Sequence, residues 1–153
     1  MKILVDGDAC PRAIKDILYK TAVRLKIEMI FVSNRYLNLP LSQFIKGIVV
    51  HEGPDEADNR IVEIMSSNDL VITADIPLAD RVIEKDGVVL NHKGALLTEE
   101  NVKQKLSVRD LLTDLRSLGI ETGGPSAFSG KDRQRFANQL DKLLTKMLKN
   151  HKK

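Results

Sequence analysis

The chain has 153 residues, which is enough for one domain with a substantial buried core. Hydrophobic residues make up 42% and charged residues 29%, a composition typical of globular proteins. No apolar run approaches the ~20 residues needed to cross a bilayer, and the short run before Asp6 does not fit a signal peptide. The lone cysteine, Cys10, excludes an internal disulfide and a cysteine-built zinc site. We therefore expect a single cytoplasmic domain, residues 1–153, with no membrane contact.

The formal net charge is only +3, but the charges are unevenly placed. Lysines crowd the C-terminal helix end, at about residues 142–153, whereas Asp55, Glu56 and Asp58 form an acidic cluster. A basic end beside an acidic site suits a polyanionic partner held at a metal. A solvated helix end explains the lysines at least as well, so both interpretations stay open.

Apolar runs and helical periodicity alternate along the chain. Residues 2–5 predict a strand, Pro11 predicts the first turn of a helix that extends to Leu25, and residues 27–32 predict a second strand. A short helix or turn near residues 41–45 precedes a third strand at 48–50. The remaining predicted elements, in chain order, are a helix opened by residues 53–54, a strand at 70–73, a helix at 77–84, a strand at 88–90, and helices at about 98–118 and 130–148.

This alternation predicts an α/β fold with a central parallel sheet of about five strands. Helices should cover both faces of the sheet, and two further helices should close the C-terminal part. The chain has no internal repeat and no linker, so the elements belong to one domain.

Acidic residues follow the ends of three predicted strands. In open parallel sheets, ligands bind beyond the carboxyl ends of the strands, where the strand order reverses. If the first and fourth strands are neighbours, Asp6 and Asp75 converge, and the helix after the third strand can bring Asp58 to the same edge. The complete set of candidate acids is Asp6, Asp8, Glu52, Asp55, Asp58, Asp75 and Asp80.

Several carboxylates in one crevice repel one another, and a hard cation removes that cost. Oxygen ligands without cysteine favour Mg²⁺ or Mn²⁺ over Zn²⁺, and such ions commonly serve phosphate-ester chemistry. We therefore interpret Asp6, Asp58 and Asp75 as catalytic metal ligands, with Asp8, Asp55 and Asp80 as further candidates. Each aspartate also has a structural interpretation, because aspartates often cap helices or stabilise their first turn.

A second signal lies before the last predicted helix. Ser129 and Asp132 have the spacing of a helix cap, and Lys131, Arg133 and Arg135 occupy the first turns. Cations at a helix N-terminus are disfavoured by the helix dipole unless an anion binds there. Ser129, Lys131 and Arg133 are therefore candidate phosphate ligands, although a turn with solvated charges fits equally well.

Four motifs carry a resemblance to a known family. The segments DGDACP, PDEADNRI, DLVITADIPLA and GGPSAFSGKDRQRFANQLD, in this order, resemble the YaiI/YqxD family of uncharacterised bacterial proteins over essentially the whole chain. That family is similar in turn to PIN-like nucleases.

The PIN-like resemblance implies metal-dependent cleavage of RNA. The expected partner is single-stranded RNA or another nucleic acid. It places an acid after the first strand, another early in a central helix and a third in a T-x-D step, matching Asp6, Asp58 and Asp75. Asp80 matches a further acid of that pattern. The PIN-like pattern has another acid on or shortly after the helix that follows the first strand. Asp16 matches this position only weakly, and Asp8 can take its place. The segment GGPSAFSGKDRQRF has no PIN-like counterpart.

Two other functions fit some of the same residues. Haloacid-dehalogenase-like phosphatases also begin with a strand and D-x-D, which would make Asp6 a phosphorylated nucleophile and Asp8 a general acid. Pro11 leaves no space for the flap of those enzymes, and Asp55 and Asp58 would have no role. A non-catalytic domain that binds RNA or a metal through the same surface is the other alternative.

Overall fold

The computed structural model describes residues 1–53, 55–107 and 128–151. Its strands form one sheet in the order β3-β2-β1-β4-β5-β6. The strands are β1 (Ile3–Asp6), β2 (Met29–Ser33), β3 (Ile45–Val49), β4 (Leu70–Ile72), β5 (Val88–Leu90) and β6 (Leu96–Leu97). The first five run parallel, and β6 pairs antiparallel with β5.

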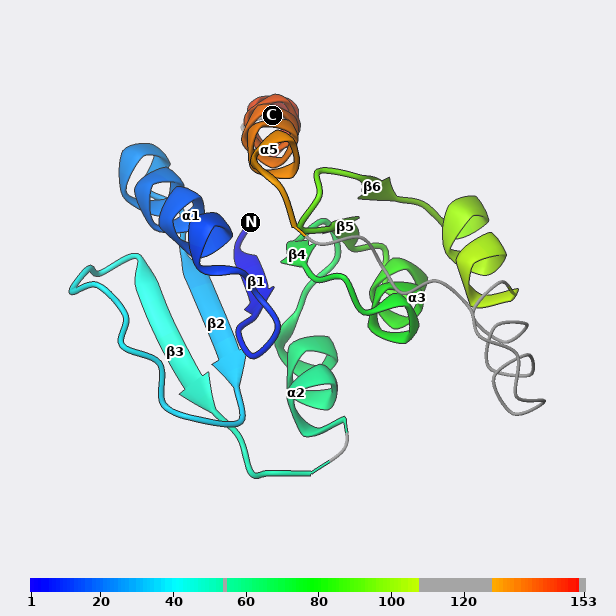
Figure 1. Ribbon diagram of the computed structural model, residues 1–153, viewed down its shortest axis with the longest axis horizontal. Helices are drawn as coiled ribbons and strands as arrows, with labels where there is room; N and C mark the ends of the chain where they lie inside the picture. Colours follow the sequence, from blue (N-terminus) through cyan, green and yellow to red (C-terminus); the bar gives the residue numbers. More distant parts are fainter. Residues whose placement is uncertain (54, 108–127, 152–153) are drawn as a thin grey trace.

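The sheet is the middle of three layers. Helices α1 (Arg12–Leu25) and α5 (Gly130–His151) cover one face, and α2 (Glu56–Ile64) and α3 (Ile76–Glu84) cover the other (Figure 1). The helical residues 99–107 pack with α2 and α3, because Val102 and Leu106 belong to the same apolar cluster. The predicted α/β class, with a mainly parallel sheet between two helical layers, is confirmed.

The alternation of β1 determines which layer each of its side chains enters. Ile3 and Val5 belong to the core under α1 and α5, and Leu4 belongs to the core under α2 and α3. Since successive strand residues face opposite sides, Asp6 shares the α2 and α3 side with Leu4. The last residue of β1 thus directs its carboxylate toward the layer that carries the other candidate acids.

The order of the strands reverses between β1 and β4. From β1 the chain adds β2 and β3 on one side and then β4 and β5 on the other, with Val5 in register with Ile72. The predicted neighbourhood of the first and fourth strands is therefore confirmed. In this kind of sheet the crevice beyond the carboxyl ends of the two central strands is the usual ligand site.

Several predicted elements differ from the observed ones. β3 begins at Ile45, so residues 45–47 are strand where we expected a helix or turn to end. β6 was not predicted, because two residues are too short for a periodic signal. Of the predicted helix at 98–118, residues 99–107 are helical and the remainder lies outside the described residues. In the described part of the chain, no helix is both long and apolar enough to cross a membrane.

Candidate functional site

Asp6 lies at the centre of the carboxyl edge of the sheet. Its side chain is buried, with 8% of its surface exposed, and its Oδ2 accepts a hydrogen bond of 3.3 Å from the Thr73 hydroxyl. Burial raises the pKa of the Asp6 carboxyl above its ordinary value, and the nearby Asp8 and Asp75 carboxylates raise it further. The end of β1 therefore holds a carboxylate that its surroundings disfavour in the charged form.

Asp75 is the N-cap of α3. Its Oδ1 accepts a 3.0 Å hydrogen bond from the Leu78 amide, and its own amide donates to the Thr73 hydroxyl oxygen at 3.0 Å. The cap uses one carboxylate oxygen, and Oδ2 makes no hydrogen bond within the described chain. The Thr73 hydroxyl links Asp6 to the start of α3 and fixes the two acids relative to each other.

Asp58 enters from a third element, the first turn of α2. The pKa of its carboxyl is raised to about 6, first by burial and then by the carboxylates of Asp75, Asp6 and Asp55, while Arg81 lowers it. Like charges raise the pKa of a carboxyl only when they lie close to it. The structure thus brings Asp58, Asp75 and Asp6 together from α2, β4–α3 and β1.

Asp55 is the N-cap residue of α2, but its side chain does not cap the helix. Its backbone is left-handed, with φ of 66°, and the carboxylate makes no hydrogen bond to the first-turn amides. A left-handed conformation costs a non-glycine residue roughly 1 kcal/mol. Asp55 therefore does not serve as a hydrogen-bonding cap, and its carboxylate adds to the repulsion at Asp58.

Asp8 is held by the loop after β2. Its Oδ1 accepts a 3.0 Å hydrogen bond from the Ser33 hydroxyl, its Oδ2 accepts one of 2.8 Å from the Asn34 amide, and Arg35 Nε lies 3.9 Å away. Both oxygens are used within the protein. Asp8 influences Asp6 electrostatically, but its direct role is to connect the ends of β1 and β2.

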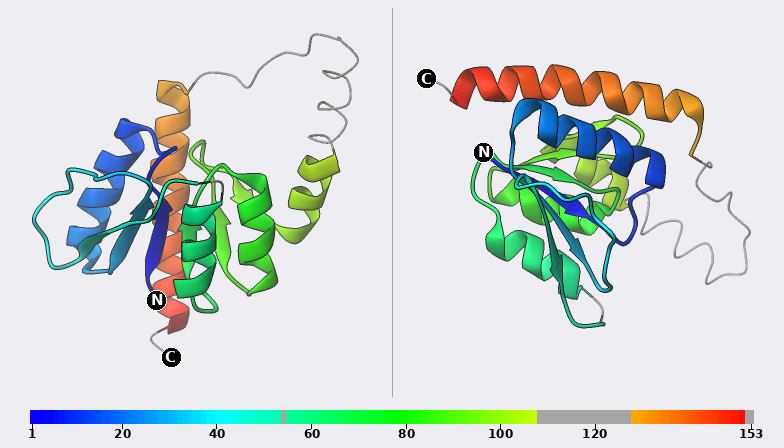
Figure 2. Two further views of the ribbon diagram at one scale, coloured as in Figure 1. Left: turned by 90° about the horizontal axis from the view of Figure 1, so that it is seen from below. Right: turned by 90° about the vertical axis from the view of Figure 1, so that its left-hand side faces the viewer.

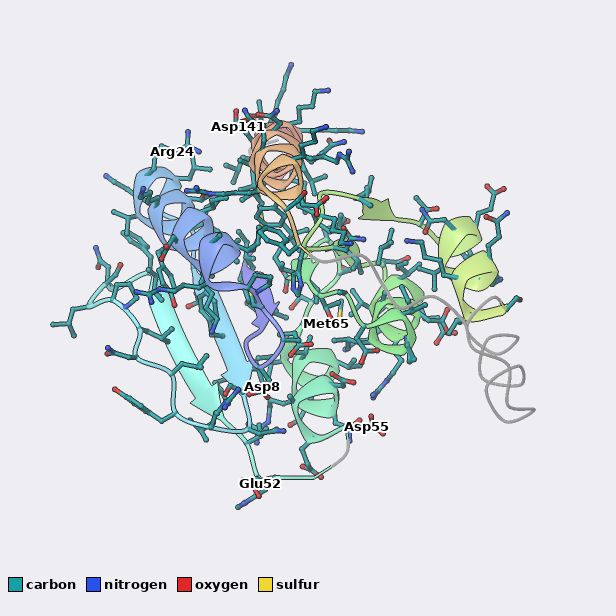
Figure 3. All side chains as sticks on the ribbon, viewed as in Figure 1. Asp8, Arg24, Glu52, Asp55, Met65 and Asp141 are labelled. Carbon is teal, nitrogen blue, oxygen red and sulfur yellow. The ribbon has the colours of Figure 1, made fainter. Side chains whose placement is uncertain are left out.

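The other candidate acids lie apart from this group. Asp80 is on α3, where its charge acts together with that of Glu84 on Lys103 in the helical segment 99–107. Glu52 is exposed in the loop before α2, away from the sheet (Figure 3). Neither acid is among the charges that raise the pKa of Asp6 or Asp58.

The candidate phosphate ligands start α5, on the opposite face of the sheet from α2. Ser129 and Asp132 form the expected reciprocal cap: the Ser129 amide donates to Asp132 Oδ2 at 3.0 Å, and the Asp132 amide donates to the Ser129 hydroxyl oxygen at 3.3 Å. Lys131 and Arg133 are exposed. The Ser129 hydroxyl is therefore already occupied by the cap, whereas the two cations are open to solvent.

The sequence analysis did not identify three buried polar residues as parts of a site. Thr73 is the hydroxyl between Asp6 and Asp75, and the T-x-D step was its only signal. Asp69 is an acid at the opposite edge, where it binds Lys2 Nζ at 2.7 Å and the Ser66 amide at 2.8 Å. His92 is buried after β5, its Nε2 has no hydrogen-bond partner among the described residues, and burial lowers its pKa to about 4.

Cys10 has no features of a nucleophile. Burial raises the pKa of its thiol to about 12, so the thiolate is scarce at neutral pH. Cys10 belongs instead to the apolar core under α1 and α5.

The fit of this edge to a metal can be judged from its free oxygens. In the described part of the chain, no three His, Cys, Asp or Glu side chains already stand as a complete ligand set. Asp58 and Asp75 nevertheless each retain at least one carboxylate oxygen without a hydrogen bond in the described chain, whereas the Asp6 carboxylate accepts from the Thr73 hydroxyl and from the Asp8 amide. The donors are all oxygen, which is the chemistry that Mg²⁺ and Mn²⁺ prefer, although the side chains do not meet at one point.

The fold and this edge define a three-layer α/β protein with clustered acids at the switch point of its sheet. A family profile described as the uncharacterised YaiI/YqxD family matches residues 4–146, and the chain belongs to this family.

The curated relatives cover the chain almost end to end and are named UPF0178 proteins. One from Maridesulfovibrio salexigens is 55% identical over 97% of this chain and 98% of its own length. One from Desulfotalea psychrophila is 54% identical over 96% and 99%, and one from Shewanella piezotolerans is 50% identical over 99% and 100%. No solved structure matches the chain.

Proposed function

We propose that the protein is a divalent-metal-dependent phosphodiesterase that cleaves RNA at the carboxyl edge of its sheet. The supporting observation is the position of three acids at one edge of the sheet: Asp6 ends β1, Asp58 lies in the first turn of α2, and Asp75 caps α3. The Thr73 hydroxyl links Asp6 to Asp75, and the pKa of Asp58 is raised by burial and then by the other two carboxylates. Three acids from separate segments lie close enough to disfavour one another's charge. Such an arrangement costs stability and is expected where a cation offsets the repulsion.

The residues that would hold the ion are Asp6, Asp58 and Asp75. A bound Mg²⁺ or Mn²⁺ would supply Lewis acidity to the phosphodiester and would favour deprotonation of the attacking water. Thr73 orients Asp6 by donating to its Oδ2, and the cap to the Leu78 amide fixes the rotamer of Asp75. These two contacts limit the movement of Asp6 and Asp75, but the three carboxylates would still have to rotate to meet at one ion, because no metal-holding group of three stands in the described chain.

The geometry weighs against the phosphatase alternative. Helix α1 begins at Arg12, directly after Pro11, which leaves little chain between β1 and α1 for an inserted flap. Asp8, the general acid in that alternative, has both oxygens engaged by Ser33 and Asn34. A carboxylate held in this way is poorly placed to protonate a leaving group.

Cleavage of an end-labelled single-stranded RNA tests the proposal. We expect the protein to cut the RNA with Mn²⁺ or Mg²⁺, to stop when EDTA is added, and to lose cleavage on Asp75→Asn. The matched control is Glu84→Gln, an exposed acid at the last residue of the same helix, which should cut normally.

Each alternative gives its own result in that experiment. Hydrolysis of a chromogenic phosphate monoester without RNA cleavage supports the phosphatase. Retardation of RNA on a gel without cleavage, in the presence of either metal, supports a binding domain. Equal cleavage by Asp75→Asn and the unaltered protein contradicts the proposed site.

A further inference from the structure

Helix α5 carries a continuous basic surface. The spacing of its cations, at intervals of four, seven, four and three residues, keeps them on one side of a helix with 3.6 residues per turn. Their side of α5 is opposite the side that buries Phe136, Leu140 and Leu144 in the core. This basic stripe consists of Lys131, Arg135, Lys142, Lys146 and Lys149, all of them exposed.

The basic stripe has few acids near it: Asp132 lies close enough to interact with Arg135, but at no ion-pair distance. None of the five side chains forms an ion pair with another described residue. Both acids of α5 are outside the stripe: Asp132 caps the helix, and Asp141 binds Arg24 of α1 at 3.4 Å (Figure 3). Five cations in line, with only Asp132 beside Arg135, repel one another, so an anion bound along the stripe is stabilised.

The surface between the cations provides further donors. A shallow depression on α5 runs from Lys131 to Lys142, and the amide side chains of Gln134, Asn138 and Gln139 line it. Amide groups donate hydrogen bonds to phosphate and sugar oxygens without reading bases. The stripe contains no aromatic side chain, so it offers no stacking platform.

The basic stripe begins at the same edge of the sheet as the acids. Gly94, in the loop after β5, lies against the backbone of Arg135 and Phe136, whereas Lys146 shares a pocket with Met1 at the amino edge. Helix α5 thus runs antiparallel to the five parallel strands, across the face opposite α2 and α3 (Figure 2). From Lys131 to Lys149 the stripe is about 27 Å long, at 1.5 Å per residue.

We propose that the basic stripe of α5 binds the phosphate backbone of a nucleic-acid strand, independently of sequence. A membrane surface is disfavoured, since the apolar side of α5 is buried in the core and cannot insert. That the strand is RNA rests on the proposed function. In that case the RNA would continue from the stripe, around the carboxyl edge of the sheet, toward Asp6.

The test measures binding in EDTA, where cleavage plays no part. A fluorescent single-stranded RNA of about 20 nucleotides is titrated with the full chain and with the triple variant Lys131→Gln, Lys142→Gln, Lys149→Gln. Arg135 is kept because it packs against Gly94, and Lys146 is kept because it lines the pocket beside Met1. The control changes the same charge on the other face: Lys85→Gln, Lys103→Gln, Lys105→Gln.

The salt dependence gives the expected numbers. If all five cations contact phosphates of a single strand, the logarithm of the binding constant falls with the logarithm of the salt concentration with a slope near −3.5. The affinity then falls about a hundredfold between 50 and 200 mM salt. The triple variant keeps two contacts, so its affinity falls less than tenfold over the same range and is weaker at 50 mM. The control variant should follow the unaltered protein.

Three outcomes overturn the inference. They are equal loss of RNA binding in the stripe and control variants, no salt dependence, and binding of acidic lipid vesicles in preference to RNA. Because cleavage is absent from the assay, failure of the proposed nuclease activity leaves a positive binding result intact. Conversely, if the protein cleaves RNA but its triple variant binds RNA normally, the proposed role of the basic stripe is wrong and the proposed nuclease function stands.

Discussion

Replacing Asp58 with asparagine should stabilise the protein in the absence of metal, and only at neutral or high pH. The pKa of this carboxyl is about 6 in the folded chain against an ordinary value of 3.8. Because the pKa is higher in the folded chain, Asp58 takes up its proton near pH 6 when the protein is folded and only near pH 4 when it is unfolded. The charged Asp58 therefore destabilises the fold above pH 6, and this cost vanishes toward pH 4.

The size of the effect follows from that difference. At face value a shift of about two pKa units corresponds to roughly 3 kcal/mol. Asp58 is partly exposed, so solvent screening reduces this figure, and the favourable dipole of the first turn of α2 opposes it by about 0.5 kcal/mol. We expect Asp58→Asn to raise the free energy of unfolding by about 1 kcal/mol at pH 8 and by almost nothing at pH 4.

Urea denaturation at both pH values, in EDTA, measures this difference. Glu63→Gln is the control on the same helix, because Glu63 is exposed and makes no ion pair in the described chain; its effect should stay within about 0.5 kcal/mol. A variant Asp58→Asn that is destabilised at pH 8, or that gains equally at both pH values, would refute the idea that neighbouring carboxylates crowd this position.

Three further predictions concern neighbouring features. Asp75→Ala should cost about 1 kcal/mol in urea denaturation through the lost cap of α3, whereas Asp75→Asn should retain the cap and most of the stability; equal losses would contradict a separate capping role. Gly94→Ala should cost more than about 2 kcal/mol, because φ is 84° and the new Cβ would lie 2.7 Å from the Arg135 carbonyl carbon; a thermal melt checks this. The His92 ring should stay neutral down to about pH 4 in an NMR titration, and since its folded-state pKa is lowered, stability from this group is lost as the pH falls below about 6.5.

The arrangement of the strands could be predicted because each segment has its own local signal. Alternating apolar runs and helical patterns indicate a parallel sheet, and the acids that follow strands indicate its carboxyl edge. The convergence of Asp6 with Asp75 depended on the neighbourhood of β1 and β4, which the sequence only suggested and the structure provides. That neighbourhood depends on contacts between distant segments, which no local pattern records.

The role of each acid was harder to predict, since identical side chains serve different purposes. Asp8 and Asp75 both follow strands, yet Asp8 has both oxygens engaged by the next loop and Asp75 has only one engaged by a cap. Asp69 precedes β4 and was not singled out, although it binds Lys2 at the opposite edge. Which hydrogen bonds occupy a carboxylate is decided by tertiary packing, so spacing alone does not separate these cases.

The central claim is that Asp6, Asp58 and Asp75 accept one divalent cation between them. Calorimetric titration with Mn²⁺ tests it most directly, at pH 8 and pH 5, for the unaltered protein and Asp58→Asn. We expect saturable binding at pH 8 that weakens at pH 5, where Asp58 is mostly protonated, and that is greatly reduced in the variant. Binding that is unchanged by pH and by Asp58→Asn, or no binding at pH 8, would contradict the account.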